Sequence, residues 1–347
     1  MKTFNEQTRI VVIGASAGGF DALRKLLKGF DKEINAAFFV VQHMQSHLHI
    51  DYASGLKQNS TLEFKYARHA APIEPGVVYL AVPDHHLLID EGVMLLTRGP
   101  RENMARPAID PLFRSAAATY SNRVIGVVLS GMLSDGTSGL HAIKACKGLI
   151  GIQDPAEASY PEMPGFALSS LQPDFCCGME DMASEITRLV NTEIPPAGEI
   201  PQYIKTEALL SKTMGSRVDL ENDLGEKVPY GCPDCGGPLW LMKNDENQDR
   251  YRCHTGHGFT EDALIEAKKK KVEESLWIAL RMFEEKLNLL KRSLKRFERN
   301  ESRFLIESTR QKIKETQKNI STLKEAMDIE PPEFNPDVAS SLQSESC

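Results

Sequence analysis

Short apolar runs of β-favouring residues alternate with helical patterns in the first half of the chain, and this alternation constrains the fold most strongly. The runs cover residues 10–13, 37–42, 77–82, 124–130 and 149–153, and helical patterns occur at 20–30, 111–120, 136–146 and 183–191. Strands that are apolar on both sides need helices on both faces of their sheet. We therefore expect an α/β fold with a doubly wound, mostly parallel sheet. Within residues 76–97, Asp90-Glu91-Gly92 predicts the turn of an antiparallel hairpin added to that sheet.

Composition and charge argue against several classes of protein. Of the 347 residues, 41% are hydrophobic and 26% are charged, as in ordinary globular proteins. The apolar run at 36–41 is too short to span a bilayer, and the N-terminus lacks the apolar core of a signal peptide. We therefore expect a cytoplasmic protein, in which the seven cysteines stay reduced. The net charge of −7 gives no reason to expect nucleic acid as the main partner.

Changes in composition divide the chain into five predicted parts. Residues 1–191 contain the alternating strands and helices, and residues 192–228, with Pro195-Pro196 and no sustained periodicity, are predicted to be a linker. A cysteine-rich ribbon at 229–260 precedes a helical segment at 261–329 that lacks glycine and proline up to its end. The polar tail, 330–347, is predicted to be disordered.

The helical segment carries apolar residues at alternating steps of four and three, which is the pattern of a heptad seam. These residues are Leu276, Leu280, Phe283, Leu287, Leu290, Leu294 and Phe297. The pattern blurs at 299–302, so the segment is either one long helix with a stutter or, as we favour, two helices folded back as a hairpin. Self-pairing of the coiled coil would give a dimer, whereas a folded-back hairpin would not. The four lysines at 268–271 are interpreted as a solvated helix face rather than a nucleic-acid or membrane site.

Ser16 lies in the run IVVIGASAGG, between the first apolar strand and a helical pattern. A serine on such a turn presents its hydroxyl outward, and nearby backbone N–H groups and the helix dipole can stabilise negative charge beside it. This is the setting that a nucleophilic serine needs if a base and an orienting acid lie close by. The alternative is a glycine-rich turn that only cradles a phosphate. The dinucleotide fingerprint GxGxxG is broken, because Ser16 stands where it requires glycine.

Two further residues follow their own strands and could complete a triad with Ser16. His43 follows the strand at 37–42, and Asp135 follows the strand at 124–130. Because the carboxyl ends of parallel strands meet at one edge of a sheet, the three side chains could converge there. Their roles would be nucleophile, general base and orienting acid. Taken alone, Asp135 could instead be the N-cap of a helix, and most of the nine histidines are interpreted as surface residues.

The GxSxG elbow of α/β hydrolases also matches residues 14–18. In that fold the serine lies well inside the chain, after an upstream oxyanion loop, and the histidine comes last. Here almost nothing precedes Ser16, and the plausible order is serine, histidine, aspartate. We therefore reject that fold.

Five ordered motifs resemble the catalytic domain of the chemotaxis protein-glutamate methylesterases, the CheB family. They are IGASAGG, VVQHM, ARPAID, LSGMLSDGTSGL and QDPAEASYPEMP, and they lie within residues 9–191. The resemblance implies a serine esterase that hydrolyses glutamate γ-methyl esters on chemoreceptors, releases methanol and needs no catalytic cofactor; some members also deamidate receptor glutamines. It makes Ser16 the nucleophile, His43 the base and Asp135 its partner. The expected partner is thus a methylated chemoreceptor or a related signalling protein, with the membrane reached only through that receptor.

The same resemblance suggests which residues line the oxyanion hole and the substrate site. Met132 lies in the motif whose backbone N–H groups help to form the hole, and Gly18, Gly19 and Arg106 complete the predicted set. Asp110 belongs with Arg106 to a motif that borders the site. The rival function is a regulatory or scaffold protein that binds a receptor or kinase through the esterase fold without turnover. An intact serine, histidine and aspartate set counts against it.

This sequence departs from the family pattern in three ways. The usual Ser-Thr-Gly-Gly has Ala17 after the serine, and Glu162 replaces a glycine before Met-Pro; both changes bear on how the substrate fits. Eight residues before the first predicted strand leave no room for the receiver domain that normally precedes the esterase. We therefore expect regulation to come from the C-terminal half or from partners.

The ribbon carries a candidate metal site. Cys232 and Cys235 form a CxxC pair, and Cys253 and His257 follow at the spacing of a zinc ribbon. About 30 residues with so little apolar content need a metal to fold, so we expect a structural Zn²⁺ with four protein ligands. His254 is a competing fourth ligand, although its adjacency to Cys253 makes simultaneous binding awkward. The alternatives are free structural thiols or a redox CxxC pair.

Overall fold

The structure is a computed structural model that describes residues 4–43, 52–213, 225–242 and 249–327. It forms two compact units, Met1–Ala267 and Lys268–Cys347, which are described separately below. No helix in these described ranges is both long enough and apolar enough to cross a membrane.

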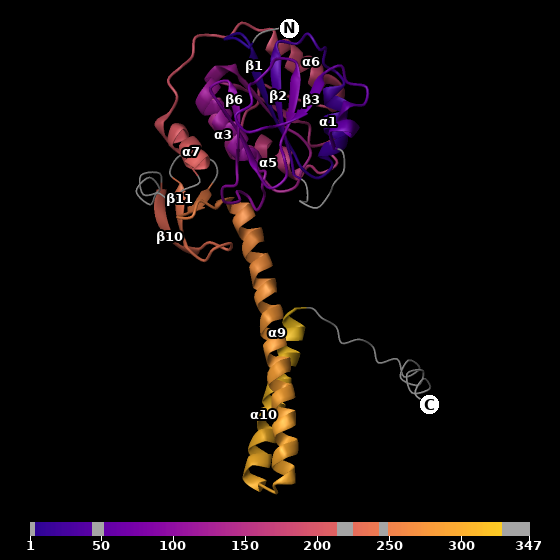
Figure 1. The fold of residues 1–347 in the computed structure, drawn as a ribbon, viewed down its shortest axis with the longest axis vertical. Helices are drawn as coiled ribbons and strands as arrows, with labels where there is room; N and C mark the ends of the chain where they lie inside the picture. The colour runs from indigo at the N-terminus through magenta and orange to yellow at the C-terminus, as the bar shows by residue number, and fades with distance from the viewer. Residues whose placement is uncertain (1–3, 44–51, 214–224, 243–248, 328–347) are drawn as a thin grey trace, which may run out of the picture. The chain divides into compact units, whose positions relative to one another are not determined.

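A seven-stranded parallel sheet forms the centre of the first unit (Figure 1). Its strand order is β3-β4-β2-β1-β7-β8-β9. The strands are β1 (Arg9–Ala15), β2 (Ala36–Gln42), β3 (Glu63–Tyr66), β4 (Val77–Leu80), β7 (Val124–Val128), β8 (Leu149–Gln153) and β9 (Phe175–Cys177). All five predicted apolar runs are strands of this sheet, and the predicted α/β class is confirmed. The short edge strands β3 and β9 were not predicted.

Both faces of the sheet are buried, as its doubly apolar strands require. On one face Val11 and Ile13 of β1 pack with α1 (Gly19–Leu27), α2 (Tyr52–Lys57) and α6 (Met179–Val190). On the other face Ile10 and Val12 pack with α3 (Ile109–Tyr120), α4 (Thr137–Ala145) and α5 (Glu162–Ser170). Because alternate residues of β1 enter opposite clusters, the strand lies at the centre of two apolar cores.

The carboxyl end of β1 is where the chain changes direction within the sheet. β1 pairs with β2 on one side and with β7 on the other, and all these pairs are parallel. The loops that follow these three strands therefore leave the same edge of the sheet. Open α/β sheets place their ligand sites at such switch points. This topology is what brings Ser16, His43 and Asp135 to one place.

The predicted antiparallel hairpin forms, but it is not added to the central sheet. β5 (His86–Asp90) and β6 (Val93–Thr97) make a separate two-stranded sheet. β5 packs against α3, and Ser115 of α3 receives a 3.0 Å hydrogen bond from the N–H of Ile89. Burial of Leu87 and Ile89 in the apolar cluster under α3 explains why the hairpin covers the sheet instead of extending it.

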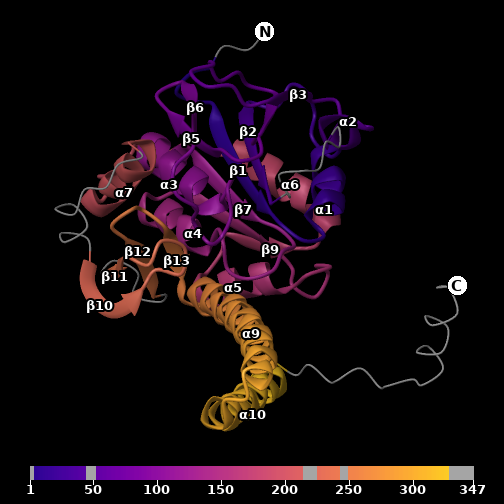
Figure 2. The same ribbon diagram turned by 60° about the horizontal axis from the view of Figure 1, so that its bottom comes forward.

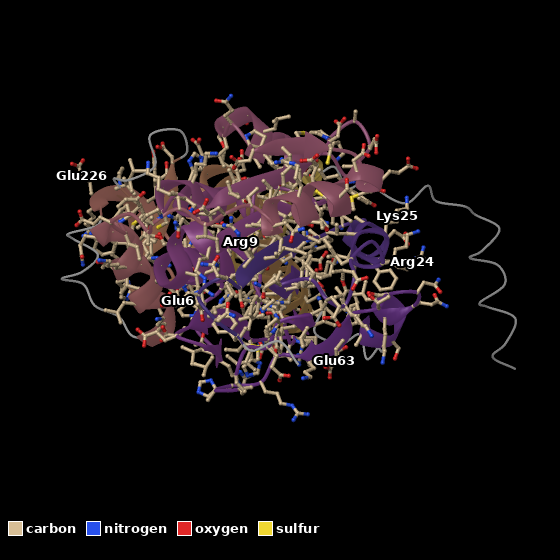
Figure 3. All side chains as sticks on the ribbon, turned by 90° about the horizontal axis from the view of Figure 1, so that it is seen from above. Glu6, Arg9, Arg24, Lys25, Glu63 and Glu226 are labelled. Carbon is tan, nitrogen blue, oxygen red and sulfur yellow. The ribbon has the colours of Figure 1, made fainter. Side chains whose placement is uncertain are left out.

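The segment predicted to be a linker contains a helix, α7 (Gln202–Thr213), which packs on α3. The start of this segment, at Thr192, is tied to the sheet by Arg9 of β1. The Arg9 guanidinium donates to the carbonyl of Asn122 at 2.8 Å and to the Thr192 hydroxyl at 3.1 Å. Seen from above, Arg9 lies among the side chains at the centre, whereas Arg24 and Glu63 lie at the periphery (Figure 3). Residues 192–213 thus pack onto the core.

A four-stranded antiparallel ribbon follows and belongs to the same compact unit (Figure 2). Its strands are β10 (Gly225–Gly231), β11 (Pro238–Met242), β12 (Arg250–Cys253) and β13 (Gly258–Thr260). Leu239 and Phe259 are buried with the first turns of α9 (Glu261–Arg299). The ribbon is therefore a small sheet with a small apolar core.

The second unit is a helical hairpin. α9 ends at Arg299 and α10 (Arg303–Ala326) runs back along it, as both ribbon views show (Figures 1 and 2). Ion pairs join Glu298 to Arg310 and, further from the turn, Glu284 to Lys324, which is antiparallel order. The favoured hairpin is thereby confirmed over the single stuttered helix. The seven seam residues are half-buried or buried along α9. The tail predicted to be disordered, from residue 330, lies outside the described residues.

Candidate active site

Ser16 sits on the turn between β1 and α1, and backbone hydrogen bonds hold that turn. The N–H of Ser16 donates to the carbonyl of Ser130 at 3.0 Å, and its own carbonyl accepts from the N–H of Gly19 at 2.9 Å. Gly18 lies at φ 71°, in the left-handed region, as the residue before α1. A Cβ at Gly18 would also lie 2.8 Å from Ser130 Oγ, so glycine is needed there. The turn thus holds the serine hydroxyl at the sheet edge.

The structure brings the three predicted triad residues into one chain of hydrogen bonds. His43 Nδ1 lies 3.1 Å from Ser16 Oγ, and His43 Nε2 lies 2.8 Å from Asp135 Oδ2. Because an ionised carboxylate only accepts, the imidazole carries its proton on Nε2 and leaves Nδ1 to accept from the serine. This is the arrangement in which a histidine removes the proton of a serine hydroxyl as it attacks.

The two ends of this chain differ in exposure. The His43 side chain keeps 20% of its surface exposed, whereas Asp135 keeps only 2%. Asp135 also accepts hydrogen bonds from the N–H of Ile109 at 2.7 Å and from the Asn103 amide at 2.8 Å. Burial alone would raise the pKa of Asp135, but the hydrogen bonds and charge of His43 and these other donors hold it below the usual range. Asp135 is thus a buried, ionised anchor for the imidazole.

A second buried carboxylate, Asp110, stands beside Asp135. Its Oδ1 accepts from the N–H groups of Gly136 and Gly139 at the start of α4, at 3.1 and 2.7 Å. Burial, and then the charge of Asp135, raise the pKa of Asp110 to about 7. The Asn103 amide donates to both carboxylates, since its Nδ2 lies 2.9 Å from Asp110 Oδ2. No sequence motif points to Asn103, because it lies in a loop that carries none of its own.

The predicted oxyanion donors differ in whether their backbone N–H groups already donate a hydrogen bond. The Gly19 N–H is used within the turn, so it is not free to bind an oxyanion. Among the described residues, the N–H groups of Gly18 and Met132 donate to no other group. The same holds for Ala17, directly after the serine, which we did not predict. The backbone that follows Ser16 and the loop at Met132 can therefore offer donors to a negative oxygen.

The hydrogen bonds of Arg106 go to residues outside the triad. Its Nε donates to Asp84 at 2.9 Å and its Nη1 to the carbonyl of Gly99 at 2.7 Å, and its described hydrogen bonds do not include the triad. The sequence reasoning also missed Gln42 of β2. Gln42 Nε2 donates to the carbonyl of Ser16 at 2.6 Å, so this side chain helps to hold the serine turn.

Glu162, at the position where the family pattern has glycine, contacts the loop after Met132. Its carboxylate accepts from the N–H of Leu133 at 3.1 Å. Leu133 is held at φ 60°, in the left-handed region. The unusual glutamate therefore braces the loop from which the Met132 N–H projects.

The predicted metal ligands converge in the ribbon. Cys232, Cys235, Cys253 and His257 each offer a ligand atom, and these atoms lie within 4.8 Å of one another. The thiols of Cys235 and Cys253 are 3.7 Å apart, close to the edge of about 3.8 Å that four ligands at a Zn–S distance of about 2.3 Å would span. Cys253 Sγ lies 3.3 Å from His257 Nδ1. The cluster thus fits one tetrahedral ion, with His257 rather than His254 as the fourth ligand.

Buried charges join the ribbon to the α/β core and to α7. Glu102 pairs with Arg114 of α3 and, at 2.8 Å, with Arg252 of β12. Glu207 of α7 pairs with Arg250 of β12 at 3.0 Å. All five side chains are at most 10% exposed. Burial alone would raise the pKa of both glutamates, but the arginines hold them below their usual range.

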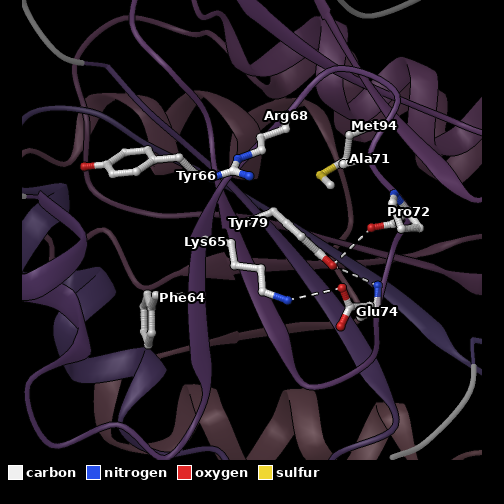
Figure 4. Close-up of a pocket in the computed structure, with 9 residues that line it drawn as sticks. All are labelled: Phe64, Lys65, Tyr66, Arg68, Ala71, Pro72, Glu74, Tyr79 and Met94. Carbon is white, nitrogen blue, oxygen red and sulfur yellow. Dashed lines mark hydrogen bonds and ion pairs between the residues drawn. The ribbon is translucent and has the colours of Figure 1, made fainter.

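A surface hollow lies elsewhere, beside the edge strand β3 and its neighbour β4 (Figure 4). Lys65 reaches Glu74 across it at 3.1 Å, and the Tyr79 hydroxyl accepts from the N–H of Glu74 at 2.9 Å. None of the residues lining it belongs to the triad. The chemistry of the molecule is therefore concentrated at the switch point rather than in this hollow.

Comparisons with known proteins match the first half of the chain. The family model described as CheB methylesterase matches residues 11–186. A putative protein-glutamate methylesterase/protein-glutamine glutaminase of Leptospira interrogans is 34% identical over 180 residues, covering 52% of this chain and 93% of that protein. A protein-glutamate methylesterase/protein-glutamine glutaminase of Methanosarcina mazei is 36% identical over 189 residues, so the match spans about half of each chain, 52%.

Among solved structures, the crystal structure of the Thermotoga maritima CheB methylesterase catalytic domain is similar to this fold. The TM-score is 0.51 at 30% sequence identity, and the match covers 52% of this chain and 98% of that one. The ribbon and the helical hairpin lie outside the residues that the family model matches.

Proposed function

This chain belongs to the CheB methylesterase family, and we propose that Ser16, His43 and Asp135 are its catalytic triad. As a member of that family it is a carboxylic ester hydrolase of the protein-glutamate methylesterase class. The observation that carries the proposal is the hydrogen-bond chain from Ser16 through His43 to the buried Asp135.

The geometry supports a two-step hydrolysis. Ser16 Oγ attacks the ester carbonyl while His43 Nδ1 takes its proton, and the resulting oxyanion accepts from backbone N–H groups such as those of Gly18 and Met132. The intermediate collapses, and His43 gives its proton to the leaving methoxide, which departs as methanol. Water then attacks the acyl-enzyme by the same route and releases the glutamate carboxylate. Each oxyanion donor is worth roughly 3 kcal/mol of barrier in comparable enzymes.

The substrate we propose is a methylated chemoreceptor or a related signalling protein. The names of the relatives support this kind of partner, and their glutaminase activity suggests that receptor glutamines are a second substrate. Hydrolysis of an amide would follow the same steps, with ammonia as the leaving group. Because the described cysteines are free thiols, we further propose that the protein works in the reducing cytoplasm.

Replacement of the nucleophile tests this function most directly. Ser16→Ala should abolish methanol release from a receptor fragment that carries glutamate γ-methyl esters, a loss of at least about 10³-fold. It should also abolish labelling by a fluorophosphonate probe, with an unchanged circular dichroism spectrum. Ser184→Ala, at an exposed serine of α6, is the matched control and should keep both. Retained hydrolysis by Ser16→Ala would disprove the triad, and a wild-type protein that neither hydrolyses nor labels would favour a scaffold.

We propose in addition that the thiol and imidazole cluster holds one structural Zn²⁺. Four protein ligands leave no open position on the ion, so its role would be to fold the ribbon. A metal assay should find about one equivalent of Zn²⁺ per chain, and Cys232→Ser should lower it. Metal-free wild-type protein, purified without chelator, would refute the site.

The proposed domain organisation follows from these parts: an esterase domain at 1–191, a ribbon at 229–260 and a helical segment at 261–329. The apolar seam residues of α9 are already half-buried or buried in the hairpin. A second copy of the chain would therefore have to bind a different face of these helices. Sedimentation of the full chain tests whether it occurs.

A further inference from the structure

The loop that holds Asn103 is clamped between the catalytic aspartate and the ribbon. Asn103 and Met104 have φ values of 49° and 63°, so two successive residues lie in the left-handed region. Such backbone persists only where the surroundings over-determine it. Both polar atoms of the Asn103 side chain make hydrogen bonds. Its amide nitrogen donates to Asp135 and Asp110, and its oxygen accepts from the N–H of Thr260 at 2.9 Å.

The ribbon contributes the other half of this clamp through β13. The N–H of Asn103 donates to the carbonyl of Gly258 at 2.8 Å, and the N–H of Gly258 donates to the carbonyl of Arg101 at 3.3 Å. The Thr260 hydroxyl lies 2.8 Å from that of Ser134, the neighbour of Asp135. β13 is therefore linked to the catalytic aspartate twice, by hydrogen bonds through Asn103 and through its chain neighbour Ser134.

The strand that makes these contacts is continuous with the proposed metal site. His257 immediately precedes Gly258, and its carbonyl accepts from the N–H of Cys253 at 2.9 Å. Cys253 ends β12, which pairs with β13. A metal that holds Cys253 and His257 together would therefore fix the hairpin that presents Gly258 and Thr260 to the Asn103 loop.

We propose that Asn103 is a positioning residue for the esterase, and that the metal-loaded ribbon controls catalysis by holding Asn103 against Asp135. This inference rests on the proposed triad. One amide nitrogen lies between the carboxylates of Asp110 and Asp135, and it satisfies an oxygen of each. Without it Asp110 loses the donor to its Oδ2, and Asp135 keeps the backbone N–H groups of Ile109 and Asp110 as donors beside His43. The two buried carboxylates then repel each other with less compensation, which shifts Asp135 relative to His43. A displacement of about 1 Å at such a site can lower the rate by about 100-fold.

The first test removes the side chain while keeping the backbone conformation. Asn103→Gly tolerates the left-handed backbone and deletes the amide, and it should lower kcat by about 10- to 100-fold with little change in KM. Asn59→Gly is the matched control, because Asn59 is an exposed asparagine with φ 66°. It should leave both constants unchanged. A wild-type kcat in folded Asn103→Gly would overturn the proposal.

The second test asks whether the ribbon acts through Asn103. Cys235→Ser removes a proposed ligand and should lower kcat to a similar degree, whereas Cys176→Ser, at an exposed cysteine outside the cluster, should not. In the Asn103→Gly background, Cys235→Ser should cause little further loss. If the two losses multiply instead, the ribbon does not act through Asn103 and the proposal fails.

A readout independent of activity completes the test. Hydrogen exchange of the backbone N–H of Asn103, which donates to Gly258, should accelerate in Cys235→Ser and after treatment of the wild type with a zinc chelator. The backbone N–H groups of β1 and β2 should stay protected. Unchanged protection of Asn103 would contradict the clamp. Fluorophosphonate labelling of wild-type Ser16 is measured in parallel, so failure of the triad itself is recognised separately from failure of this inference.

Discussion

The central sheet and the ribbon share one compact unit, but different interactions hold them together. Strands β1 and β2 are buried along their whole length, and apolar clusters cover both faces of the sheet. The ribbon has only small apolar clusters: one includes two of its own cysteines and side chains of α9, and another pairs Met242 with Leu210 of α7. Its contacts with the core are largely ion pairs and polar hydrogen bonds, such as those of Glu102 and Asn103.

This difference separates what folds the enzyme from what tunes it. Burial of apolar surface contributes roughly 25 cal/mol per Å² and does not depend on pH or on metal. Thiolate ligands and buried ion pairs depend on both. The sheet should therefore stay folded under conditions that unfold the ribbon. Asp135, the triad residue linked to the ribbon through Asn103, should be displaced before Ser16 or His43.

Metal removal should produce the largest contrast between the two regions. Structural Zn²⁺ contributes on the order of 10 kcal/mol to the folding of isolated zinc-finger peptides, so a chelator should unfold the ribbon and leave the sheet folded. Trp240 of β11 is 5% exposed and reports on the ribbon. In the Trp277→Phe variant it is the sole tryptophan of the chain. Its emission should shift to the red on chelation while far-ultraviolet circular dichroism changes little. Loss of both signals together would show one cooperative unit.

The same substitution in the two regions should have unequal cost. Phe39 of β2 is fully buried and stacks on Tyr79 at 5.3 Å between ring centroids, so Phe39→Ala should lower the free energy of unfolding by about 3–5 kcal/mol. Phe259 of β13 is 2% exposed. With the metal bound, Phe259→Ala should cost less, about 2 kcal/mol. Urea unfolding followed by circular dichroism measures both. Equal costs would mean that apolar packing carries the ribbon too.

Acid should weaken the ribbon side before it affects the sheet. Burial opposes the ionised form of Glu207, but Arg250 and Arg114 overcome it and hold its pKa below the usual range. Its contribution to stability is therefore present above the unfolded pKa of about 4.3 and is lost as pH falls through the folded value. Glu207→Gln should lower the free energy of unfolding at pH 7 by about 3 kcal/mol, and stability should then fall less steeply as the pH is lowered.

The control for this substitution lies on the same small sheet. Glu226 of β10 is exposed and appears at the rim in Figure 3. Glu226→Gln should change stability by no more than about 0.5 kcal/mol. If stability falls equally steeply with decreasing pH in Glu207→Gln and in the wild type, other carboxylates set the pH dependence.

The contrast also explains what the sequence could and could not predict. Ser16 and His43 each directly follow an apolar parallel strand, and Asp135 comes a few residues beyond one, so strand patterning alone placed all three at one edge. Cysteine spacing likewise placed the thiol cluster. Local patterns of this kind carry enough information because the contacts they imply follow from strand direction or from ligand geometry.

Contacts between distant segments left no such pattern. Nothing near Asn103 indicates that its oxygen meets Thr260, which lies 157 residues further along the chain. α7 was taken for part of a linker because its buried face mixes the apolar residues Ile204 and Ala208 with Glu207, which meets arginines of other elements, so the face forms no continuous apolar stripe. The hairpin β5–β6 was placed in the sheet because periodicity identifies a strand but not its neighbour.

The smallest expected effect lies on the open side of the active site. The Glu162 carboxylate accepts a hydrogen bond from the N–H of Leu133. It also lies in the first turn of α5, where a carboxylate stabilises the helix by about 0.3–1 kcal/mol. Glu162→Gly should therefore change stability by less than about 1 kcal/mol and kcat by only a few-fold, whereas Glu162→Gln keeps the acceptor and should resemble the wild type. Both variants are compared with Asn103→Gly in one assay of ester hydrolysis. A loss for Glu162→Gly as large as that for Asn103→Gly would mean that the loop at Met132 and Leu133 is at least as sensitive as the ribbon side of Asp135.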